Sequence, residues 1–307
     1  MKIIKNYIEL GQVAEQLKND ELVVIPTETV YGLAANALSE TAVKKIFLVK
    51  GRPQDNPLII HTNSKENIYK YTINQPNYIE AFIDKFMPGP LTLVLDKAEI
   101  IPSIVSAGLT TIGIRIPNNA ITLELLRLVD LPLAAPSANK SGRPSPTKIE
   151  HIIADYGIDF EGIYACIDDD ECQVGIESTI IKCEPNKVQV LRPGVISKED
   201  IQNIIDIEVI EYQGSELLSP GMRYKHYSPN IPILMSAIFD ENLRTLNLTY
   251  KQNIQHLRNV MDFDEHSLYD IYRNAESMGY VKINIIESIE LVNNKGLFNR
   301  VLRSLEK

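Results

Sequence analysis

Short apolar runs alternate with amphipathic segments from the start of the chain to about residue 194. Runs of Val, Ile and Leu that end at Gly, Pro or polar residues are typical of buried strands, and apolar residues three or four positions apart are typical of helices. This alternation predicts an α/β sheet domain. The expected strands span residues 21–26, 57–62, 91–96, 111–117, 131–136, 178–183 and 187–193. The expected helices span residues 39–51, 77–87, 119–130 and 146–157, and residues 1–20 read as a strand followed by an amphipathic helix.

Connection lengths indicate how these strands are arranged. The last two expected strands are joined only by the three residues "EPN", which is too short for a parallel crossover. The sheet is therefore expected to be mixed. In the helix over residues 39–51, Ser39 is a candidate N-cap and Gly51 a candidate C-cap.

The pattern changes after residue 197. A further helix and a short strand are expected up to residue 210, and "YQGSELLSPGMRYKHYSPNIP" then reads as a linker because it lacks periodicity. Beyond it, expected strands at 232–237 and 280–287 and a closing helix at 295–307 predict a small α/β unit. We therefore predict a first domain over residues 1–210, a linker over 211–231 and a second domain over 232–307.

Composition and charge narrow the class of protein. The 307 residues carry a formal net charge of -9, which argues against coating nucleic acid through bulk positive charge but leaves a local basic pocket open. The three cysteines form no C-x-x-C pair, and we expect free thiols in a reducing compartment. Residues 1–20 lack the apolar core of a signal peptide, and no apolar run approaches bilayer length. A cytoplasmic protein without membrane contact is expected.

Common site motifs are absent from the sequence. It has no G-x-x-x-x-G-K-[ST], G-x-G-x-x-G, H-E-x-x-H or G-x-S-x-G, so a bound nucleotide would not use a standard phosphate loop. The acidic run over residues 168–171 is either a solvated turn, which we favour, or a metal site. The sequence gives no set of metal ligands.

Polar residues instead gather at the expected strand ends. "PTETVYGLAANA" follows the first long strand with Thr27, Glu28 and Thr29, and Gly32 would let the backbone approach a ligand. Loops at strand ends are where α/β folds bind ligands, although a plain turn that caps a helix explains the same residues. In "KGRPQDN", Lys50 and Arg52 lie where cations favour the dipole at a helix C-terminus, which we favour for this stretch alone, but they would also suit phosphate neutralisation.

Further strand ends show the same character. Arg115, inside the apolar run "TIGIRIP", must either face solvent or pair with an anion in a cleft. The loop "AAPSANKSGRPSPT" is dense in hydroxyl, amide and basic groups, which could hold phosphate oxygens or could form an exposed flexible loop. Two later stretches, "GIESTII" and "LRPG", contribute Ser178, Thr179 and Arg192.

The linker adds basic and aromatic residues side by side. Such residues suit stacking on a nucleotide or RNA, or packing of a strap between domains. They are Arg223, Tyr224, Lys225, His226 and Tyr227. Taken together, the strand-end motifs predict one anionic small molecule held in a cleft.

Seven motifs in order carry a family resemblance. They are "PTETVYGLA", "KGRPQDNPLIIH", "PGPLTLVL", "IGIRIP", "APSANKSGRPSPT", "ESTII" and "LRPG". Over about two-thirds of the chain, their order and spacing resemble the threonylcarbamoyl-AMP synthase family, also called the YrdC-like family. "SPGMRYKHYSP" resembles the linker of its longer, two-domain branch. The resemblance implies a twisted mixed sheet with flanking helices, then a linker and a small Rossmann-like domain, here abbreviated.

The resemblance also implies a reaction. Members of this family convert L-threonine, bicarbonate and ATP to threonylcarbamoyl-AMP with release of pyrophosphate, which makes them nucleotidyltransferases. A separate transferase complex then moves the threonylcarbamoyl group to tRNA. Mg²⁺ is expected with ATP, and weak direct contact with tRNA is left open. A water-poor, phosphate-neutralising cleft suits this chemistry, because the carbamate of threonine must react before it decomposes.

Site residues are implied position by position. The catalytic set is Lys50, Arg52, Ser137 and Asn139. The ATP-contacting set is Arg52, Asn56, Thr111, Ser137, Ser145 and Arg192, with His226 and Tyr227 closing over the nucleotide. The threonine-contacting set is Thr29, His61, Arg115, Ala135 and Ser178, in which Arg115 would pair with the amino acid carboxylate and His61 could instead be structural.

Two other functions compete with this one. A non-catalytic module that binds double-stranded RNA or tRNA could use the same basic cleft, although the acidic net charge weighs against it. A relative that performs carbamoyl-adenylate chemistry on another substrate, as in hydrogenase-maturation carbamoyltransferases, would usually carry zinc-binding cysteine motifs, which this sequence lacks.

Overall fold

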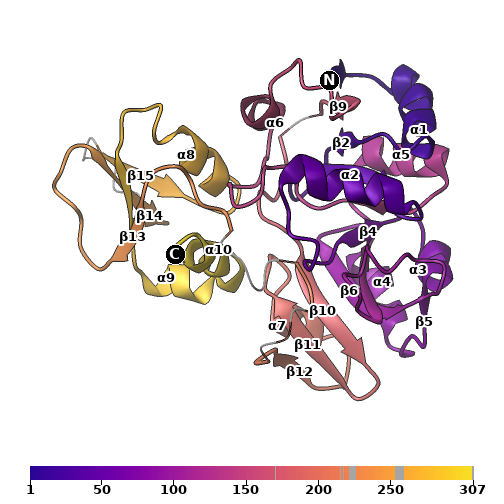
Figure 1. The fold of residues 1–307 in the computed structure, drawn as a ribbon. Coiled ribbons are helices and arrows are strands. Elements are labelled where there is room, and N and C mark those ends of the chain that lie inside the picture. The colour runs from indigo at the N-terminus through magenta and orange to yellow at the C-terminus, as the bar shows by residue number, and fades with distance from the viewer. Residues whose placement is uncertain (170, 215, 217, 221–225, 253–258, 306–307) are drawn as a thin grey trace.

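The described residues form two units, each built around its own sheet (Figure 1). The structure is a computed structural model of residues 1–307, and it describes all of them except 170, 215, 217, 221–225, 253–258 and 306–307. The N-terminal unit contains a twelve-stranded sheet and the C-terminal unit a four-stranded sheet. Among the described residues, no helix has both the length and the apolar character needed to cross a bilayer.

The N-terminal sheet is mixed, as predicted from the connection lengths. Its strand order is β1-β9-β2-β3-β8-β4-β7-β6-β10-β11-β12, with β5 paired to β6. Strand β10 runs parallel to β6 but antiparallel to β11, its successor across "EPN". The strands are β1 (Lys2–Ile4), β2 (Val23–Ile25), β3 (Gly32–Asn36), β4 (Ile59–His61), β5 (Thr72–Ile73), β6 (Leu91–Lys97), β7 (Thr111–Arg115), β8 (Leu133–Ala134), β9 (Ala165–Ile167), β10 (Thr179–Glu184), β11 (Lys187–Arg192) and β12 (Val209–Glu211).

Helices cover both faces of this sheet. Helices α1 and α5 pack side by side over one buried apolar cluster, and α2, α3 and α4 contribute to a second and larger one. The helices are α1 (Leu10–Lys18), α2 (Glu40–Lys50), α3 (Lys65–Tyr71), α4 (Ile79–Phe86), α5 (Ala120–Val129), α6 (Ile149–Tyr156) and α7 (Lys198–Gln202), with a 3-10 turn η1 at Tyr7–Glu9.

Helix α2 has both predicted caps. The Ser39 side chain accepts a hydrogen bond from the backbone N–H of Ala42, and Gly51 ends the helix with a left-handed φ of 61°. Glycine tolerates this conformation because it has no Cβ. The caps fix where the helix stops, and thereby where Lys50 and Arg52 lie.

Register places several candidate site residues at one edge of the sheet. Strand β4 runs parallel to β7, so His61 lies opposite Arg115. On the other side of β4, Ala135 donates its N–H to the carbonyl of Ile59, at 3.0 Å. A bridge then joins Gly32 to Ser137. The ends of β4 and β7 therefore lie together, and the chain that leaves β8 runs past the start of β4 to the start of β3.

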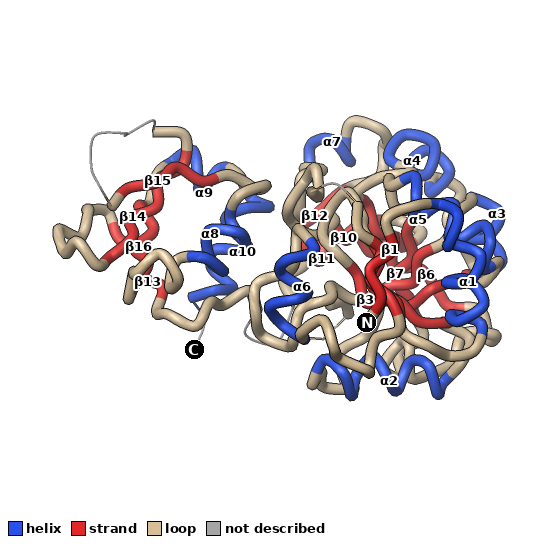
Figure 2. Tube along the Cα trace, turned by 90° about the horizontal axis from the view of Figure 1, so that it is seen from above, coloured by secondary structure: helices blue, strands red, loops and turns tan. Residues whose placement is uncertain are grey.

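The C-terminal unit is a small parallel α/β domain. Its strand order is β13-β16-β14-β15, and every pair is parallel. Helices α8 and α10 lie on the side of this sheet that faces the N-terminal unit (Figures 1 and 2). The elements are β13 (Ile233–Ser236), β14 (Thr245–Tyr250), β15 (Val260–Phe263), β16 (Lys282–Ile286), α8 (Leu268–Asn274), α9 (Ile289–Asn293) and α10 (Lys295–Leu305).

Several elements differ from the prediction. The sequence "GLAAN" forms strand β3, although a turn that caps a helix explained it equally well. No prediction covered α3, β5, β9, β14, β15, α8 or α9. Four of these elements, β14, β15, α8 and α9, belong to the C-terminal unit. Because the sequence did not reveal them, this domain was expected to be abbreviated. The domain boundaries at residues 210 and 231 stay predictions.

Candidate functional site

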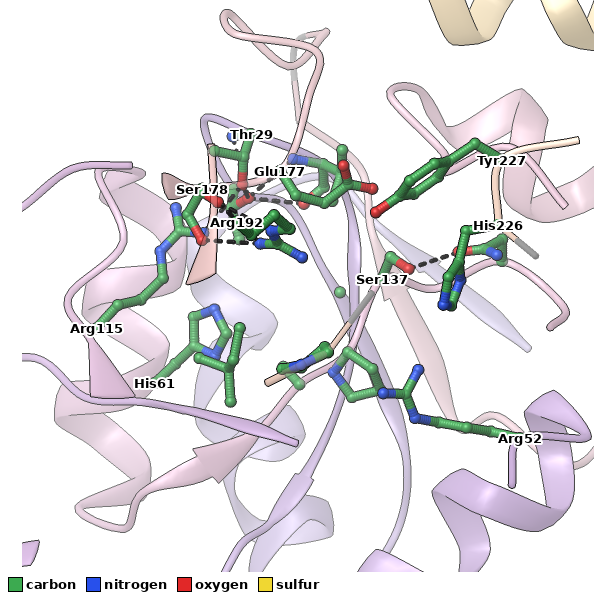
Figure 3. A pocket seen from close by; sticks show the side chains of 18 residues that line it. Thr29, Arg52, His61, Arg115, Ser137, Glu177, Ser178, Arg192, His226 and Tyr227 are labelled. Atoms are coloured by element: carbon green, nitrogen blue, oxygen red, sulfur yellow. Dashed lines mark hydrogen bonds between the residues drawn. The ribbon is translucent and has the colours of Figure 1, made fainter. Parts of the chain in front are cut away.

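One pocket collects most of the predicted site residues. The ends of β4 and β7, the loop after β8 and the start of β3 contribute to its lining, and residues after β12 close it from the linker side. Arg115 and His61 lie at one end, and Arg52, His226 and Tyr227 at the other (Figure 3). The predicted residues that line it are Thr29, Arg52, His61, Arg115, Ala135, Ser137, Asn139, Ser178, Arg192, His226 and Tyr227.

The first end of the pocket is organised around Arg115. Its side chain is 5% exposed. Of the two alternatives that the sequence left open for Arg115, a solvent-facing side chain is therefore wrong. Nη1 donates to Thr29 Oγ1 at 3.1 Å, and Nη2 lies 2.7 Å from Glu28 Oε1. The approach to Glu28 lacks hydrogen-bond geometry, because Arg115 Nε and Nη2 and both Glu28 oxygens have no hydrogen-bond partner among the described residues. Arg115 thus keeps hydrogen-bonding capacity for an anion.

His61 lies beside Arg115 as a neutral imidazole. Burial, and then the positive charge of Arg115, lower the pKa of His61 to about 3. Its Nδ1 has no hydrogen-bond partner among the described residues. A buried polar atom in this condition is costly unless something pairs with it. His61 is therefore suited to hydrogen-bond a ligand without carrying charge.

His226 is the corresponding residue at the other end. Burial, and then the nearby charge of Arg52, lower the pKa of His226 to about 4. Its Nε2 also has no partner among the described residues. The His226 ring packs against that of Tyr227, with centroids 5.4 Å apart. This end therefore combines aromatic rings, a neutral imidazole and the Arg52 guanidinium.

Lys50 and Arg52 diverge at the end of α2. Arg52 lines the pocket, and its Nη2 donates to the Pro57 carbonyl at 3.1 Å. Lys50 is 3% exposed and does not belong to the described lining; its Nζ donates to the carbonyls of Ser137 and Asn139. Burial, and then Arg52, lower the pKa of Lys50 well below its usual value. Lys50 was expected to face phosphates, but here it supports the loop that carries Ser137 and Asn139.

That loop presents Ser137 and Asn139 in a fixed arrangement. Ser137 Oγ donates to Asn139 Oδ1 at 2.6 Å. Asn139 Nδ2 in turn donates to the carbonyls of Lys140 and Arg143, both at 2.9 Å. The loop is therefore ordered by its own side chains and by Lys50, and it is not the exposed flexible loop of the alternative interpretation.

Arg192 and Ser178 form the wall between the two ends. The Arg192 guanidinium donates from Nε and Nη2 to the Ser178 carbonyl, at 3.1 and 2.9 Å. Ser178 Oγ lies 2.8 Å from Thr92 Oγ1. Strand β11 therefore brings a buried cation to the pocket, where the residue before β10 accepts its hydrogen bonds.

Glu177 is a lining residue that sequence reasoning did not select. Its Oε1 accepts from Ser145 Oγ, and its Oε2 accepts from Arg300 Nε at 2.7 Å. Burial opposes its ionisation, but Arg300 and then Arg192 outweigh this effect and lower the pKa of Glu177 to about 2. The available signal was a carboxylate inside "GIESTII", although its partner Arg300 lies far along the chain.

Three of the ATP-contacting predictions lie outside the described lining of the pocket. Ser145 is fully buried behind Glu177, and Asn56 is buried in the loop after α2. Thr111 begins β7, four residues from Arg115, which corresponds to roughly 13 Å along a strand. Their contacts with ATP stay predictions.

The acidic run and the cysteines lie elsewhere. Asp168 pairs with Lys5 at 3.0 Å, and Asp169 accepts from Asn119 at 2.8 Å, while Asp170 is outside the described residues. Among described residues, no group of three or more His, Cys, Asp and Glu is placed to hold a metal ion. The three cysteines are free and buried, and burial raises the pKa of Cys172 to about 12.

Comparison with known proteins decides the family. The Sua5, YciO and YrdC family, described as "Telomere recombination", matches residues 15–194. A second family, described as "Threonylcarbamoyl-AMP synthase, C-terminal domain", matches residues 196–304. The chain belongs to the threonylcarbamoyl-AMP synthase family.

Relatives within the threonylcarbamoyl-AMP synthase family include archaeal and bacterial proteins. The threonylcarbamoyl-AMP synthase of Pyrococcus abyssi is 43% identical over 71% of this chain, which corresponds to 65% of the relative's own length. The Bacillus subtilis enzyme of the same name is 41% identical over 80% of this chain and 71% of its own length.

A solved structure of the same family extends the similarity to both units. The crystal structure of P. abyssi Sua5 complexed with L-threonine superimposes with a TM-score of 0.88 at 33% identity, covering 99% of this chain and 98% of that chain. The predicted fold class, a mixed sheet followed by a small α/β domain in the two-domain branch of the threonylcarbamoyl-AMP synthase family, is confirmed. Arg223, Tyr224 and Lys225 of the linker lie outside the described residues.

Proposed function

We propose that this chain is an L-threonylcarbamoyladenylate synthase. The observation that carries the proposal is that one pocket has two chemically different ends. One end has Arg115 and a neutral His61, which suit an amino acid, and the other has Arg52, His226 and an aromatic ring, which suit a nucleotide. Family membership supports the same activity, and P. abyssi Sua5, a structural relative, binds L-threonine.

The proposed reaction joins three substrates. The threonine amine and bicarbonate form a carbamate with loss of water. A carbamate oxygen then attacks the α-phosphorus of ATP, so that a new O–P bond forms, the bond from the α-phosphorus to the bridging oxygen breaks, and pyrophosphate leaves. The chain's contribution is to position the reactants and to neutralise phosphate charge in a buried site.

Each end of the pocket receives a role in this proposal. Arg115 pairs with the threonine carboxylate, while Thr29 and His61 offer hydrogen bonds to the amino acid. Arg52, Ser137 and Asn139 act at the phosphates, and Lys50 holds the loop that bears the last two. The remaining predicted ligands stay assigned, with Ala135 and Ser178 on the threonine side and Asn56, Thr111, Ser145, Arg192, His226 and Tyr227 on the ATP side.

Magnesium enters the proposal as part of the ATP substrate. The carboxylate in the described lining, Glu177, is already paired with Arg300, and the described residues contain no cluster of metal ligands. Mg²⁺ keeps several waters and often binds mainly through substrate phosphates. We therefore propose that it arrives as the magnesium complex of ATP.

The product is proposed to serve tRNA modification. Threonylcarbamoyl-AMP is a mixed anhydride that must be passed to an acceptor, and the family resemblance names a separate tRNA threonylcarbamoyl transferase complex. Weak contact of this chain with tRNA and a cytoplasmic location remain predictions from the sequence. They add no step to the chemistry in the pocket.

Substrate dependence tests the proposal. The purified chain should convert ATP to AMP and pyrophosphate only when both L-threonine and bicarbonate are present. L-Valine is the matched control, because it replaces the hydroxyl of threonine with a methyl group, and it should support much less turnover. Absence of threonine-dependent turnover, together with RNA binding that weakens steeply with salt and ignores ATP, would instead favour the RNA-binding module.

A further inference from the structure

The C-terminal unit is joined to the N-terminal unit by buried charged side chains. Helix α10 contributes Arg300, which pairs with Glu177, and helix α8 contributes Arg273, which pairs with Asp155 through both carboxylate oxygens at 3.0 Å. Desolvated charges stabilise an interface only when their partners are placed accurately. The two units therefore have one well-defined docked arrangement.

Arg300 donates three hydrogen bonds to the N-terminal unit and two within its own helix. Its side chain is fully buried. Nε donates to Glu177 Oε2 at 2.7 Å, Nη2 to the Glu177 carbonyl at 2.9 Å, and Nη1 to the Pro193 carbonyl at 2.8 Å. A lysine could not make this set of bonds, because it lacks the planar fork.

Glu177 connects this contact to the pocket. The oxygen that does not meet Arg300 accepts from Ser145, and Glu177 itself lines the pocket near Tyr227 (Figure 3). The Arg300-bound oxygen also accepts from Tyr269 Oη of α8 at 3.0 Å. One carboxylate thus binds α8, α10 and Ser145.

Tyr227 is held by the same group of side chains. Its ring stacks on Tyr269 with centroids 5.4 Å apart, and the Arg300 guanidinium lies 5.7 Å from its centroid. Tyr227 also has a φ of 63°, a left-handed conformation that is uncommon for a bulky residue and that favourable surroundings must stabilise. The C-terminal helices provide those surroundings.

We propose that Glu177, Arg300 and Tyr269 are positioning residues for the nucleotide end of the pocket. They fix the C-terminal unit against the N-terminal one and hold Tyr227 where ATP is expected to bind, while Ser145 supports Glu177 from behind. The C-terminal domain therefore builds one side of the nucleotide site through a buried ion pair. This inference rests on the proposed function for the identity of the ligand, ATP.

Close backbone contact supports the same arrangement independently of charge. A Cβ on Gly296, in the first turn of α10, would lie 2.6 Å from the carbonyl oxygen of Gly194. Real Cβ atoms essentially never come so close to an oxygen. Gly296→Ala should favour the helix itself, since alanine has the higher helix propensity, yet force the two units apart.

Calorimetric titration with ATP, and separately with L-threonine, tests the proposal on the full chain. Arg300→Met should weaken ATP binding about tenfold or more, equivalent to at least ~1.4 kcal/mol, while threonine affinity stays within about twofold. Glu177→Gln/Arg300→Met should be less impaired than Arg300→Met alone, because the double variant leaves no unpaired buried carboxylate. Gly296→Ala should also weaken ATP binding, and Lys295→Met, an exposed change on the same helix, should not.

The outcomes separate this inference from the proposed function. If the wild-type chain binds ATP and all variants bind it equally well, the positioning role is wrong and the proposed function survives. Equal losses of ATP and threonine affinity would also overturn it, since they would indicate general unfolding. If the wild-type chain does not bind ATP, the proposed function fails first. Circular dichroism checks that each variant is folded. If Arg300→Met does not fold, the double variant and Gly296→Ala still test the positioning role.

Discussion

At the scale of single residues, the pocket is marked by buried polar atoms that the described protein leaves unpaired. His61 Nδ1, His226 Nε2 and Arg115 Nε all belong to this class. Such atoms are rare in native proteins because each costs the free energy of its lost water contacts. Their concentration around one pocket indicates groups held ready for a ligand.

Arg115 provides the first prediction. Arg115→Gln should raise the KM for threonine by about ten- to a hundredfold, because a charge-assisted hydrogen bond contributes ~1.5–3 kcal/mol. The KM for ATP should change little, since Arg52 and His226 lie at the other end of the pocket. Steady-state kinetics with each substrate varied in turn measures both values.

A second effect must be separated from this one. Arg115→Gln leaves the Glu28 carboxylate, 3% exposed, without its cation, and loss of one partner of a buried ion pair costs ~3–5 kcal/mol of stability. The double variant Glu28→Gln/Arg115→Gln should recover stability in urea unfolding but not threonine affinity. A double variant that recovers both would show that Arg115 does not contact the substrate. Arg127→Gln, at an exposed pair on α5, is the control.

At the scale of elements, apolar strands were predictable, whereas strands made of small or polar residues, such as β3 and β14, were missed. Runs such as "LTLVLD" became β6 because continuous β-branched and leucine residues suit a buried strand. The prediction missed β3, "GLAAN", because glycine and alanine carry little strand propensity. In β14, Asn247 is buried through a hydrogen bond with Asn284 on the neighbouring strand, a partner that local pattern does not reveal.

The site follows the same rule. The residues at strand ends could be found from the sequence because neighbouring strands bring their ends together, as His61 and Arg115 show. The direction in which a side chain points could not be found from the sequence. Lys50 and Arg52 are two residues apart, yet they bind different partners. Glu177 was missed because Arg300, which explains its burial, is 123 residues away.

Lys50 provides a prediction for helix α2 and the loop that it supports. Lys50→Met keeps the apolar stem but leaves the carbonyls of Ser137 and Asn139 without their donor. The loop should shift, and because small misplacement in a site can cost about a hundredfold, kcat should fall by on the order of that factor. Initial-rate measurement of pyrophosphate release checks this.

Stability should respond much less than activity to this change. Removing a desolvated ammonium offsets part of the cost of two unpaired carbonyls, so the free energy of unfolding should fall by only about 1–3 kcal/mol. Lys44→Met is the matched control, because Lys44 lies on the exposed face of the same helix and pairs there with Glu40. Full activity of Lys50→Met would show that the ammonium neither supports the loop nor reaches the substrate.

At the scale of the whole molecule, the two units meet through charged groups that are buried only because they are paired. Glu177 faces Arg300 from α10, Arg192 from β11, Tyr269 from α8 and Tyr227 from the linker. Although burial favours the neutral acid, Arg300 and Arg192 prevail and hold the pKa of Glu177 at about 2, below the usual 4.5. Protonation of Glu177 is therefore linked to the docking of the two units.

The sign of this linkage predicts how stability depends on pH. Because the pKa of Glu177 is lower in the folded chain than in the unfolded chain, its contribution is fully present above pH 4.5 and is lost as pH falls toward 2. Glu177→Gln mimics the protonated acid, so the variant should be less stable than the wild type at pH 7, and the difference should shrink steadily below about pH 4.5. Urea unfolding at pH 7, 5, 4 and 3 measures the difference, with Glu15→Gln on the exposed face of α1 as the control. If the difference in the free energy of unfolding stays constant down to pH 3, the contribution of Glu177 to stability does not depend on its charge. The ion pair with Arg300 would then not be what holds the two units together.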